Sequence, residues 1–291
     1  MKKNNFVVTV LTLALCGVFL TTFTSCKQTK YVGLQLYSLR DSIYKDVPGA
    51  IRKVGEMGYK FVEPAGYSNG KFYGMEPAAF RELCEKNGLK VLSSHTGMPA
   101  PDSAGWNNVM AWWDTCIAAH AAVGVKYIVQ PFMADEAYKS LDGLKKYVKY
   151  FNAVGEKCNA KGIKFGYHNH SSEFETKLDS TIIVEDYLIG NTDPSKVVFE
   201  LDLYWCVQGK ANPVDYFNKF PGRFELWHIK DQKEVGASGK MDFAAYWASA
   251  AKSGMKYGIV EVEDYSFDEF TSCKKSLDFL NNTGYVVLPE K

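Results

Sequence analysis

The stretch Lys161-Gly-Ile-Lys-Phe-Gly-Tyr-His-Asn-His170 joins the end of one predicted helix to a complete predicted strand. Gly162 directly follows the helical pattern, and a glycine in the left-handed conformation commonly ends a helix. In the strand that follows, Gly166, His168 and His170 share one face, because side chains alternate along a strand. The stretch therefore predicts a tight helix-to-strand junction whose strand ends in titratable groups.

The same alternation recurs about every 30 residues from residue 31 to residue 285, without a low-complexity stretch or linker. Strands are predicted at residues 31–39, 59–65, 89–95, 125–131, 163–170, 197–203, 224–230 and 257–263. Helices are predicted at residues 47–57, 77–87, 107–123, 141–161, 181–189, 213–219, 243–252 and 267–281. Eight such units favour an α/β fold in which the strands close into a (β/α)8 TIM barrel. An open, doubly wound sheet is the alternative.

Polar side chains gather at the carboxyl ends of these predicted strands. In a parallel barrel those ends form the face that carries the active site. The polar groups that share the inward parity of their strands are Glu63, His95, His168, His170, Glu200, Asp202, His228, Lys230, Glu261 and Glu263. The sequence therefore places a group of titratable side chains at one mouth of the barrel.

Four of the five histidines belong to this group, and the exception is His120 in the predicted helix 107–123. Any one of them alone is better interpreted as a structural histidine. Their convergence is harder to explain by packing, because buried charges need partners or a metal. Histidine with aspartate and glutamate is the ligand set expected for a divalent ion.

The first 25 residues are predicted to be a secretory signal. Lys2 and Lys3 precede an uncharged apolar run at residues 6–23, and small residues lead to Cys26. The pattern resembles a bacterial lipoprotein signal, in which Cys26 is lipidated and residues 26–30 form a tether before a barrel domain at residues 31–291. An uncleaved membrane anchor is the alternative. Either interpretation predicts an exported chain with a lipid or membrane attachment, and we expect the periplasmic side because no acidic run follows Cys26.

Charge and cysteine content exclude some classes of protein. The full chain has 34 basic and 33 acidic side chains. Removal of the predicted signal takes away Lys2 and Lys3, and the net charge of the remainder is then about −1. This balance gives no footprint for nucleic acid. The five cysteines after Cys26 lack CxxC spacing, so we expect small core residues and neither a disulfide framework nor a zinc finger. The oligomeric state is left open.

The strand ends resemble the xylose-isomerase-like barrel superfamily of sugar phosphate isomerases and epimerases. The matching stretches include Tyr167-His-Asn-His170, Glu200-Leu-Asp202, Trp227-His-Ile-Lys-Asp231 and Val260-Glu-Val-Glu263. The resemblance covers residues 31–285 and implies one divalent ion, such as Mn, Mg, Co or Zn. Carried over by position, it implies the ligands His168, Asp202, His228 and Glu261. Many epimerases have a glutamate where His168 stands, so His170 and Glu173 remain alternatives for the first ligand.

The resemblance also implies roles for the other residues of the mouth. We expect His170, Glu261 and Lys230 to act in catalysis. Substrate contacts are expected from Glu63, His95, Glu263, Tyr37 and Trp205. Glu63 has a second interpretation as an ion-pair partner of Lys230. Glu200 lies one pleat deeper and is interpreted as a structural partner.

A metal on a hydroxy-ketone stabilises the enediolate that forms when the neighbouring proton is lost. Epimerases, isomerases and lyases share this intermediate. Relatives of this barrel act on 3-keto-glycosides, and the export signal favours free or glycosidic carbohydrate over sugar phosphates. The favoured interpretation is a lyase or hydratase on a 3-keto-glycoside. The alternatives are an isomerase or epimerase on free sugars and a non-catalytic sugar-binding lipoprotein.

Overall fold

Eight parallel strands form a barrel in the computed structural model, which describes residues 30–288. The strands are β1 (Val32–Gln35), β2 (Phe61–Glu63), β5 (Lys90–Val91), β6 (Tyr127–Gln130), β7 (Lys164–His168), β10 (Val197–Asp202), β11 (Leu226–Ile229) and β12 (Tyr257–Val260). Their order in the sheet is β5-β2-β1-β12-β11-β10-β7-β6. The two ends of this order meet where His95 bridges Val129 in parallel register. The prediction of a closed barrel is confirmed.

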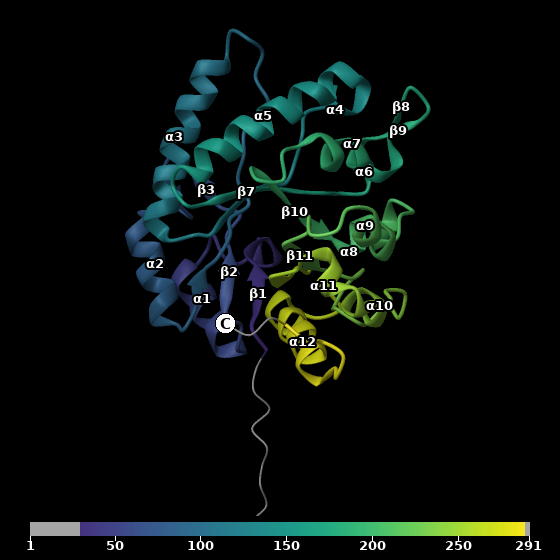
Figure 1. Cartoon of the computed structure of the whole chain (residues 1–291). Coiled ribbons are helices and arrows are strands. Elements are labelled where there is room, and N and C mark those ends of the chain that lie inside the picture. The colour runs from purple at the N-terminus through teal and green to yellow at the C-terminus, as the bar shows by residue number, and fades with distance from the viewer. Residues whose placement is uncertain (1–29, 289–291) are drawn as a thin grey trace, which may run out of the picture.

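Helices surround the barrel, one unit after each strand (Figure 1). They are α1 (Val47–Met57), α2 (Pro77–Lys86), α3 (Trp106–Val123), α5 (Leu141–Asn159), α7 (Val184–Asn191), α9 (Pro213–Lys219), α10 (Phe243–Ala248) with α11 (Ala250–Ser253), and α12 (Glu269–Asn282). In Figure 1 the colour advances around the ring, so the yellow α12 comes back close to the purple β1. The pairing of β1 with β12 closes the same circuit between the two ends of the domain.

The helix ends follow the predicted chemistry. Gly58, Gly88 and Gly162 have φ of 104°, 74° and 71°, the left-handed conformation that costs glycine little. Asn212 caps α9 by accepting a hydrogen bond from the Val214 backbone N–H. These local signals fix where each helix turns into the next strand.

Some predicted elements are shorter or interrupted. The predicted first strand ends early because residues after Gln35 form the 3-10 helix η1 (Leu36–Leu39). The predicted helix 243–252 is two helices separated at Ser249, and the predicted helix 181–189 begins only at Val184. Short elements that the sequence did not predict fill the loops: β3 (Tyr67–Ser68), β4 (Lys71–Phe72), α4 (Glu136–Lys139), α6 (Ser172–Glu175), β8 (Lys177–Leu178), β9 (Ile182–Ile183) and α8 (Leu203–Gln208).

An apolar plug fills the lower part of the barrel, towards the amino ends of the strands. It consists of Phe61, Leu92, Tyr127, Val129, Val198, Leu226, Tyr257 and Ile259. Gly33 makes room for this plug, because a Cβ on it would lie 2.1 Å from the Phe61 ring. With the lower half sealed by side chains, the polar groups are confined to the upper mouth.

The five cysteines in the described residues are buried with free thiols, as expected for core positions: Cys84, Cys116, Cys158, Cys206 and Cys273. Within residues 30–288, no helix is both long and apolar enough to cross a membrane. The predicted signal at residues 1–25, the tether and Cys26 lie outside the described residues apart from Lys30, so these stay predictions.

Candidate active site and metal centre

Three side chains from neighbouring strands meet at the mouth of the barrel. Asp202 ends β10, His228 lies on β11, and Glu261 directly follows β12. His228 Nδ1 lies 3.4 Å from a Glu261 oxygen and 3.8 Å from Asp202 Oδ2. All three residues are buried. We call Asp202, His228 and Glu261 the rim triad.

Two atoms of the rim triad lack a hydrogen-bond partner although they are buried. Asp202 Oδ1 accepts a hydrogen bond from the Trp205 backbone N–H and so caps α8, but Asp202 Oδ2 has no such partner. His228 Nδ1 is also without one. Buried polar atoms of this kind are uncommon and call for an explanation such as an ion.

The donor atoms of the rim triad fit a divalent cation. They supply one imidazole nitrogen and two carboxylate groups, a set used for divalent metals. Donors about 2.0–2.2 Å from a shared ion lie roughly 3 to 3.5 Å apart. His228 Nδ1 lies 3.4 Å from Glu261 and 3.8 Å from Asp202, and all three ligand atoms lie within 4.8 Å of one another. The rim triad could therefore hold a metal ion with three of the four expected ligands.

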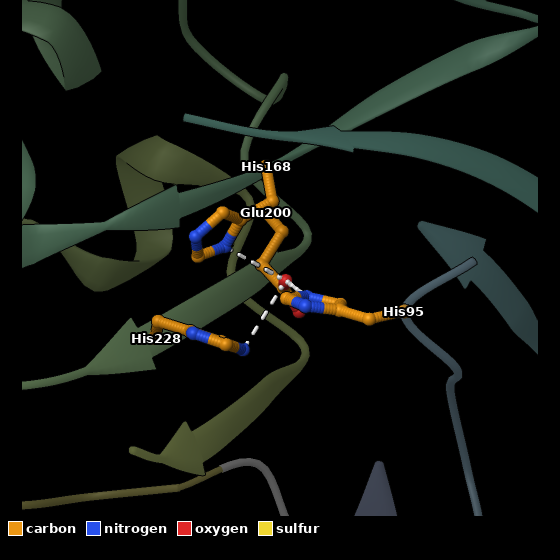
Figure 2. Close-up of side chains that lie close together, drawn as sticks. All are labelled: His95, His168, Glu200 and His228. Carbon is orange, nitrogen blue, oxygen red and sulfur yellow. Dashed lines mark hydrogen bonds and ion pairs between the residues drawn. The ribbon is translucent and has the colours of Figure 1, made fainter. Parts of the chain in front are cut away.

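His168, the fourth expected ligand, lies in a second group, which shares His228 with the rim triad. Figure 2 shows the rings of His95, His168 and His228 converging on the Glu200 carboxylate. Glu200 Oε2 lies 2.6 Å from His95 Nε2, 3.1 Å from His168 Nδ1 and 3.2 Å from His228 Nε2. We call these four residues the deep cluster. Glu200, which the sequence suggested only as a structural partner, lies at its centre.

Glu63 adds a second carboxylate beside the deep cluster. Its Oε1 lies 2.8 Å from His228 Nε2 and 3.2 Å from His95 Nε2, and it accepts a hydrogen bond from the Gln35 amide. The alternative in which Glu63 pairs with Lys230 is wrong, because Lys230 lies against other carboxylates. Glu63 thus contacts the histidines of the mouth.

Lys230 pairs with the last two carboxylates of the mouth. Its Nζ lies 3.5 Å from Glu261 and 3.1 Å from Glu263. Burial disfavours the charged amine, but Glu261 and Asp202 outweigh it and raise the pKa of Lys230. Near neutral pH, Lys230 is therefore a cation at the edge of the rim triad.

The carboxylates of the rim triad titrate differently. Burial raises the pKa of Asp202 to about 7, although Lys230 and His228 oppose the change. For Glu261 burial acts in the same direction, but the nearby Lys230 and His228 outweigh it and lower its pKa. The negative charge of the rim triad consequently resides mainly on Glu261 when no ion is bound.

The histidines separate into charged and neutral forms. Burial opposes the charge on His228, but Glu200 and Glu261 raise its pKa well above the ordinary value. Burial and the positive charge of His228 lower the pKa of His168. Burial also lowers the pKa of His170, with Glu173 and Glu261 opposing. His168 and His170 are therefore neutral at pH 7 and able to accept a proton or a metal.

Glu173, one alternative for the first ligand, is occupied elsewhere. Its oxygens accept hydrogen bonds from the hydroxyls of Tyr138 and Tyr167 and from the His170 backbone N–H. Tyr167 has the outward parity on β7 and belongs to the core between strands and helices. Glu173 thus supports the loop after β7, and its contacts hold it apart from the rim triad.

A cavity of about 440 Å³ opens above these groups. It is lined by Tyr37, Ala65, Tyr67, His95, Thr96, Gly97, Pro131, Phe132, His168, His170, Glu261 and Glu263. Of the expected substrate contacts, Tyr37, His95 and Glu263 line it. Trp205 lies nearby, with its ring 5.8 Å from that of His170. The volume is in the range typical of small-molecule sites.

The sequence did not single out Tyr67, Thr96, Gly97 or Phe132 as residues of this cavity. Thr96, Gly97 and Phe132 lie in loops after barrel strands, and Tyr67 lies on the short strand β3. Phe132, 38% exposed, directly follows the predicted fourth strand. Its position just beyond a strand end is the one feature of the sequence that could have predicted this, because an apolar side chain does not by itself indicate a binding site.

His120 is a structural histidine, as expected for the one histidine away from the strand ends. It is buried in α3, with Nδ1 2.7 Å from the Cys116 carbonyl oxygen. Its ring packs against those of Tyr67 and Phe72 on the β3–β4 hairpin. Burial lowers its pKa to about 4.

Comparisons with known proteins agree with this geometry. Two solved structures, both described as sugar phosphate isomerase/epimerases from Parabacteroides distasonis, are 34% and 30% identical with TM-scores of 0.82. They match 89% and 91% of this chain and 100% and 98% of their own. An inosose dehydratase of Clostridium beijerinckii is 28% identical over 162 residues, which are 54% of this chain and 48% of that protein. The chain spans about half the length of the curated relatives it matches.

Residues 51–283 match the family described as xylose isomerase-like TIM barrel, which is most of the described chain. The eight-stranded barrel and its polar mouth are the structural counterpart of that match. The chain therefore belongs to the xylose isomerase-like TIM barrel family.

Proposed function

We propose that the protein is a divalent-metal-dependent enzyme that removes a proton next to the carbonyl of an oxidised sugar, and that it acts as a lyase or hydratase on 3-keto-glycosides. The observation that carries the proposal is the rim triad, which has two buried atoms without a hydrogen-bond partner and whose Glu261 lines a cavity of about 440 Å³. A bound divalent ion would polarise the sugar carbonyl and favour loss of the neighbouring proton. The residues that would hold it are Asp202, His228 and Glu261.

His170 is the group best suited to take the proton. It lines the cavity, and burial keeps it neutral near pH 7, so an imidazole nitrogen is free to accept. Lys230 stays protonated and faces Glu261 and Glu263. Lys230 does not itself line the cavity, but a fixed ammonium against the lining carboxylates Glu261 and Glu263 stabilises negative charge that develops on a bound sugar.

On a 3-keto-glycoside the electron balance favours elimination. The 3-keto group acidifies the C2 proton, which passes to His170. The electron pair left at C2 forms the C1–C2 double bond as the bond from C1 to the aglycone oxygen breaks. The aglycone leaves as an alcohol once it gains a proton, and addition of water to the same double bond is the hydratase reaction.

The cavity favours an uncharged sugar. None of its lining residues in the described part of the chain is lysine or arginine, and two of them are carboxylates, Glu261 and Glu263. A phosphate group would meet negative charge there. Tyr37, which is 46% exposed, and Phe132 offer apolar ring surface at the opening, as sugar rings and aglycones require.

Direct assay tests this proposal. Protein loaded with Mn2+ is incubated with 3-keto-glucosides in heavy water, and NMR follows aglycone release and deuterium at C2. The proposal predicts both, with loss of both in Asp202→Asn. Interconversion of free ketoses and aldoses without aglycone release would assign an isomerase instead. Tight sugar binding with neither exchange nor turnover would assign a binding protein.

We further propose that the chain is exported and anchored by lipid at Cys26, on the periplasmic side of a bacterial membrane. The support is the sequence of residues 1–26. Cell fractionation is expected to find the wild-type chain with the membrane and Cys26→Ala released from it. A wild-type chain that stays in the cytoplasm would contradict the proposal.

A further inference from the structure

We propose that the protein holds a second divalent ion, coordinated by His95, His168 and Glu200 beside the rim triad. This site takes a borderline ion of the Zn2+ class, because two imidazoles and one carboxylate are a common zinc set. It does not depend on the sugar reaction proposed above. It assigns a different role to His168, which now belongs to a site of its own.

The distances among the three side chains are close to those of a coordination sphere. Glu200 Oε2 lies 2.6 Å from His95 Nε2 and 3.1 Å from His168 Nδ1. Donors bound tetrahedrally about 2.0–2.1 Å from one zinc ion lie roughly 3.3 Å apart. The ligand atoms of all three residues lie within 4.8 Å of one another, and strands β7 and β10 hold His168 and Glu200 in register.

Two buried atoms point to an occupant. Glu200 Oε1 and Glu63 Oε2 have no hydrogen-bond partner, and both residues are at most 1% exposed. The histidines contact only the other oxygen of each carboxylate, Glu200 Oε2 and Glu63 Oε1. A divalent ion bound by the Glu200 carboxylate would satisfy the oxygen that the histidines leave without a partner.

His228 separates the two sites. One imidazole ring uses a single nitrogen for a metal and carries a proton on the other. His228 Nδ1 faces Asp202 and Glu261, and Nε2 lies 2.8 Å from Glu63. Donation of the Nε2 proton to Glu63 fixes the ring for the rim ion, since metal-bound histidines commonly donate their other N–H to a carboxylate. The second ion is left with His95, His168 and Glu200.

The second site is open to the cavity. His95 and His168 both line the cavity above the barrel mouth. An ion can therefore enter, and its fourth position faces the space that the sugar would occupy. Sites with three protein ligands and an open position are typical of catalytic rather than structural zinc.

Counting bound ions tests this inference. Metal-free full-length protein is titrated with Co2+, the bound metal is measured by mass spectrometry after dialysis, and the visible spectrum is recorded. We expect two ions per chain in the wild type and one in His95→Ala. The affinity of the lost ion should fall at least roughly 100-fold. Asp202→Asn should also bind one ion, and it should keep the more intense spectrum of a four-coordinate, nitrogen-rich site.

Two further variants keep the result decisive. Glu200→Gln has nearly the shape of the native side chain and should also lose the second ion, which covers the case that His95→Ala does not fold. Glu185→Gln alters another buried carboxyl group, whose pKa burial raises well above the usual value, and should retain both ions.

The outcomes separate the second site from the rim triad. A single ion that survives in His95→Ala and Glu200→Gln but is lost in Asp202→Asn overturns the second site and leaves the proposed function intact. A single ion lost in His95→Ala and kept in Asp202→Asn supports the second site and contradicts the rim triad.

Discussion

Asp202 has two roles that depend on different oxygens. Oδ1 caps α8 through the Trp205 backbone N–H, and Oδ2 faces His228. In Asp202→Asn the cap can persist through the amide oxygen, while the charge that attracts a cation is gone. We expect at least about 100-fold weaker Mn2+ binding, by calorimetry, with thermal stability of the metal-free protein retained. An unchanged Mn2+ affinity would remove Asp202 from the metal site.

Lys230 supplies the fixed positive charge of the mouth. Replacing it by Met keeps most of the apolar stem and removes the ammonium that faces Glu261 and Glu263. We expect turnover of a 3-keto-glucoside to fall about 100-fold, the usual effect of losing one charge-stabilising donor, with the count of bound ions unchanged. Lys230→Arg is the matched control, because it keeps the charge. Equal turnover in Lys230→Met and the wild type would contradict the role.

The residues of the mouth were predictable from two features of the sequence, the face of the strand on which a residue lies and its position at the carboxyl end of that strand. Side chains at the carboxyl ends of inward-facing strand positions meet, and this placed Asp202, His228 and Glu261 together. Depth was not predictable in the same way. Three histidines contact Glu200, and Lys230 pairs with Glu261 and not with Glu63. Both arrangements depend on side-chain rotamers that the sequence does not specify.

At the scale of elements, α3 carries a buried histidine whose charge the fold excludes. Burial lowers the pKa of His120 to about 4 from an ordinary 6.5. The folded state is favoured fully above pH 6.5, where His120 is neutral in both states. Between pH 6.5 and 4 the unfolded chain binds a proton at His120 more readily than the folded chain, so the free energy of unfolding falls. A difference of this size corresponds to about 3 kcal/mol.

The variant His120→Leu isolates this effect. Urea unfolding at pH 7 and pH 4.5 should show a loss of stability in the wild type that is about 2–3 kcal/mol larger than in His120→Leu. The variant also loses the hydrogen bond to the Cys116 carbonyl oxygen, which lowers its stability equally at both pH values. The same pH dependence in both proteins would show that His120 titrates normally.

Strong local signals explain why most elements were predicted. Glycine at residues 58, 88 and 162 and Asn212 before Pro213 mark helix ends through backbone chemistry that the structure repeats. The misses lie where the sequence carries no such signal. The Gln35 side chain caps η1 by accepting a hydrogen bond from the Tyr37 N–H, and the break at Ser249 separates two apolar segments with one continuous helical pattern.

At the scale of the whole molecule, a bound ion couples the strands of the mouth. The rim triad joins β10, β11 and the residue after β12, so an ion there ties three parts of the barrel that are far apart in sequence. Binding to the folded state alone stabilises it by about 2.7 kcal/mol at a concentration 100 times Kd. For a domain of this size that corresponds to roughly 5–10 °C in Tm.

Calorimetric scans of chelator-treated protein with and without Mn2+ measure that shift. We expect a rise of roughly 5–10 °C in the wild type and a clearly smaller rise in Asp202→Asn. Glu185→Gln, changed outside the mouth, should show the wild-type shift. Equal shifts in the wild type and Asp202→Asn would place the stabilising ion away from the rim triad.

The location of the ion is the most direct test of the account. Crystals of the protein with Mn2+ should give an anomalous difference peak about 2.0–2.2 Å from Asp202 Oδ2, His228 Nδ1 and a Glu261 oxygen. A map without a peak between these three side chains, with the Lys230 ammonium holding both carboxylates instead, would contradict the central claim.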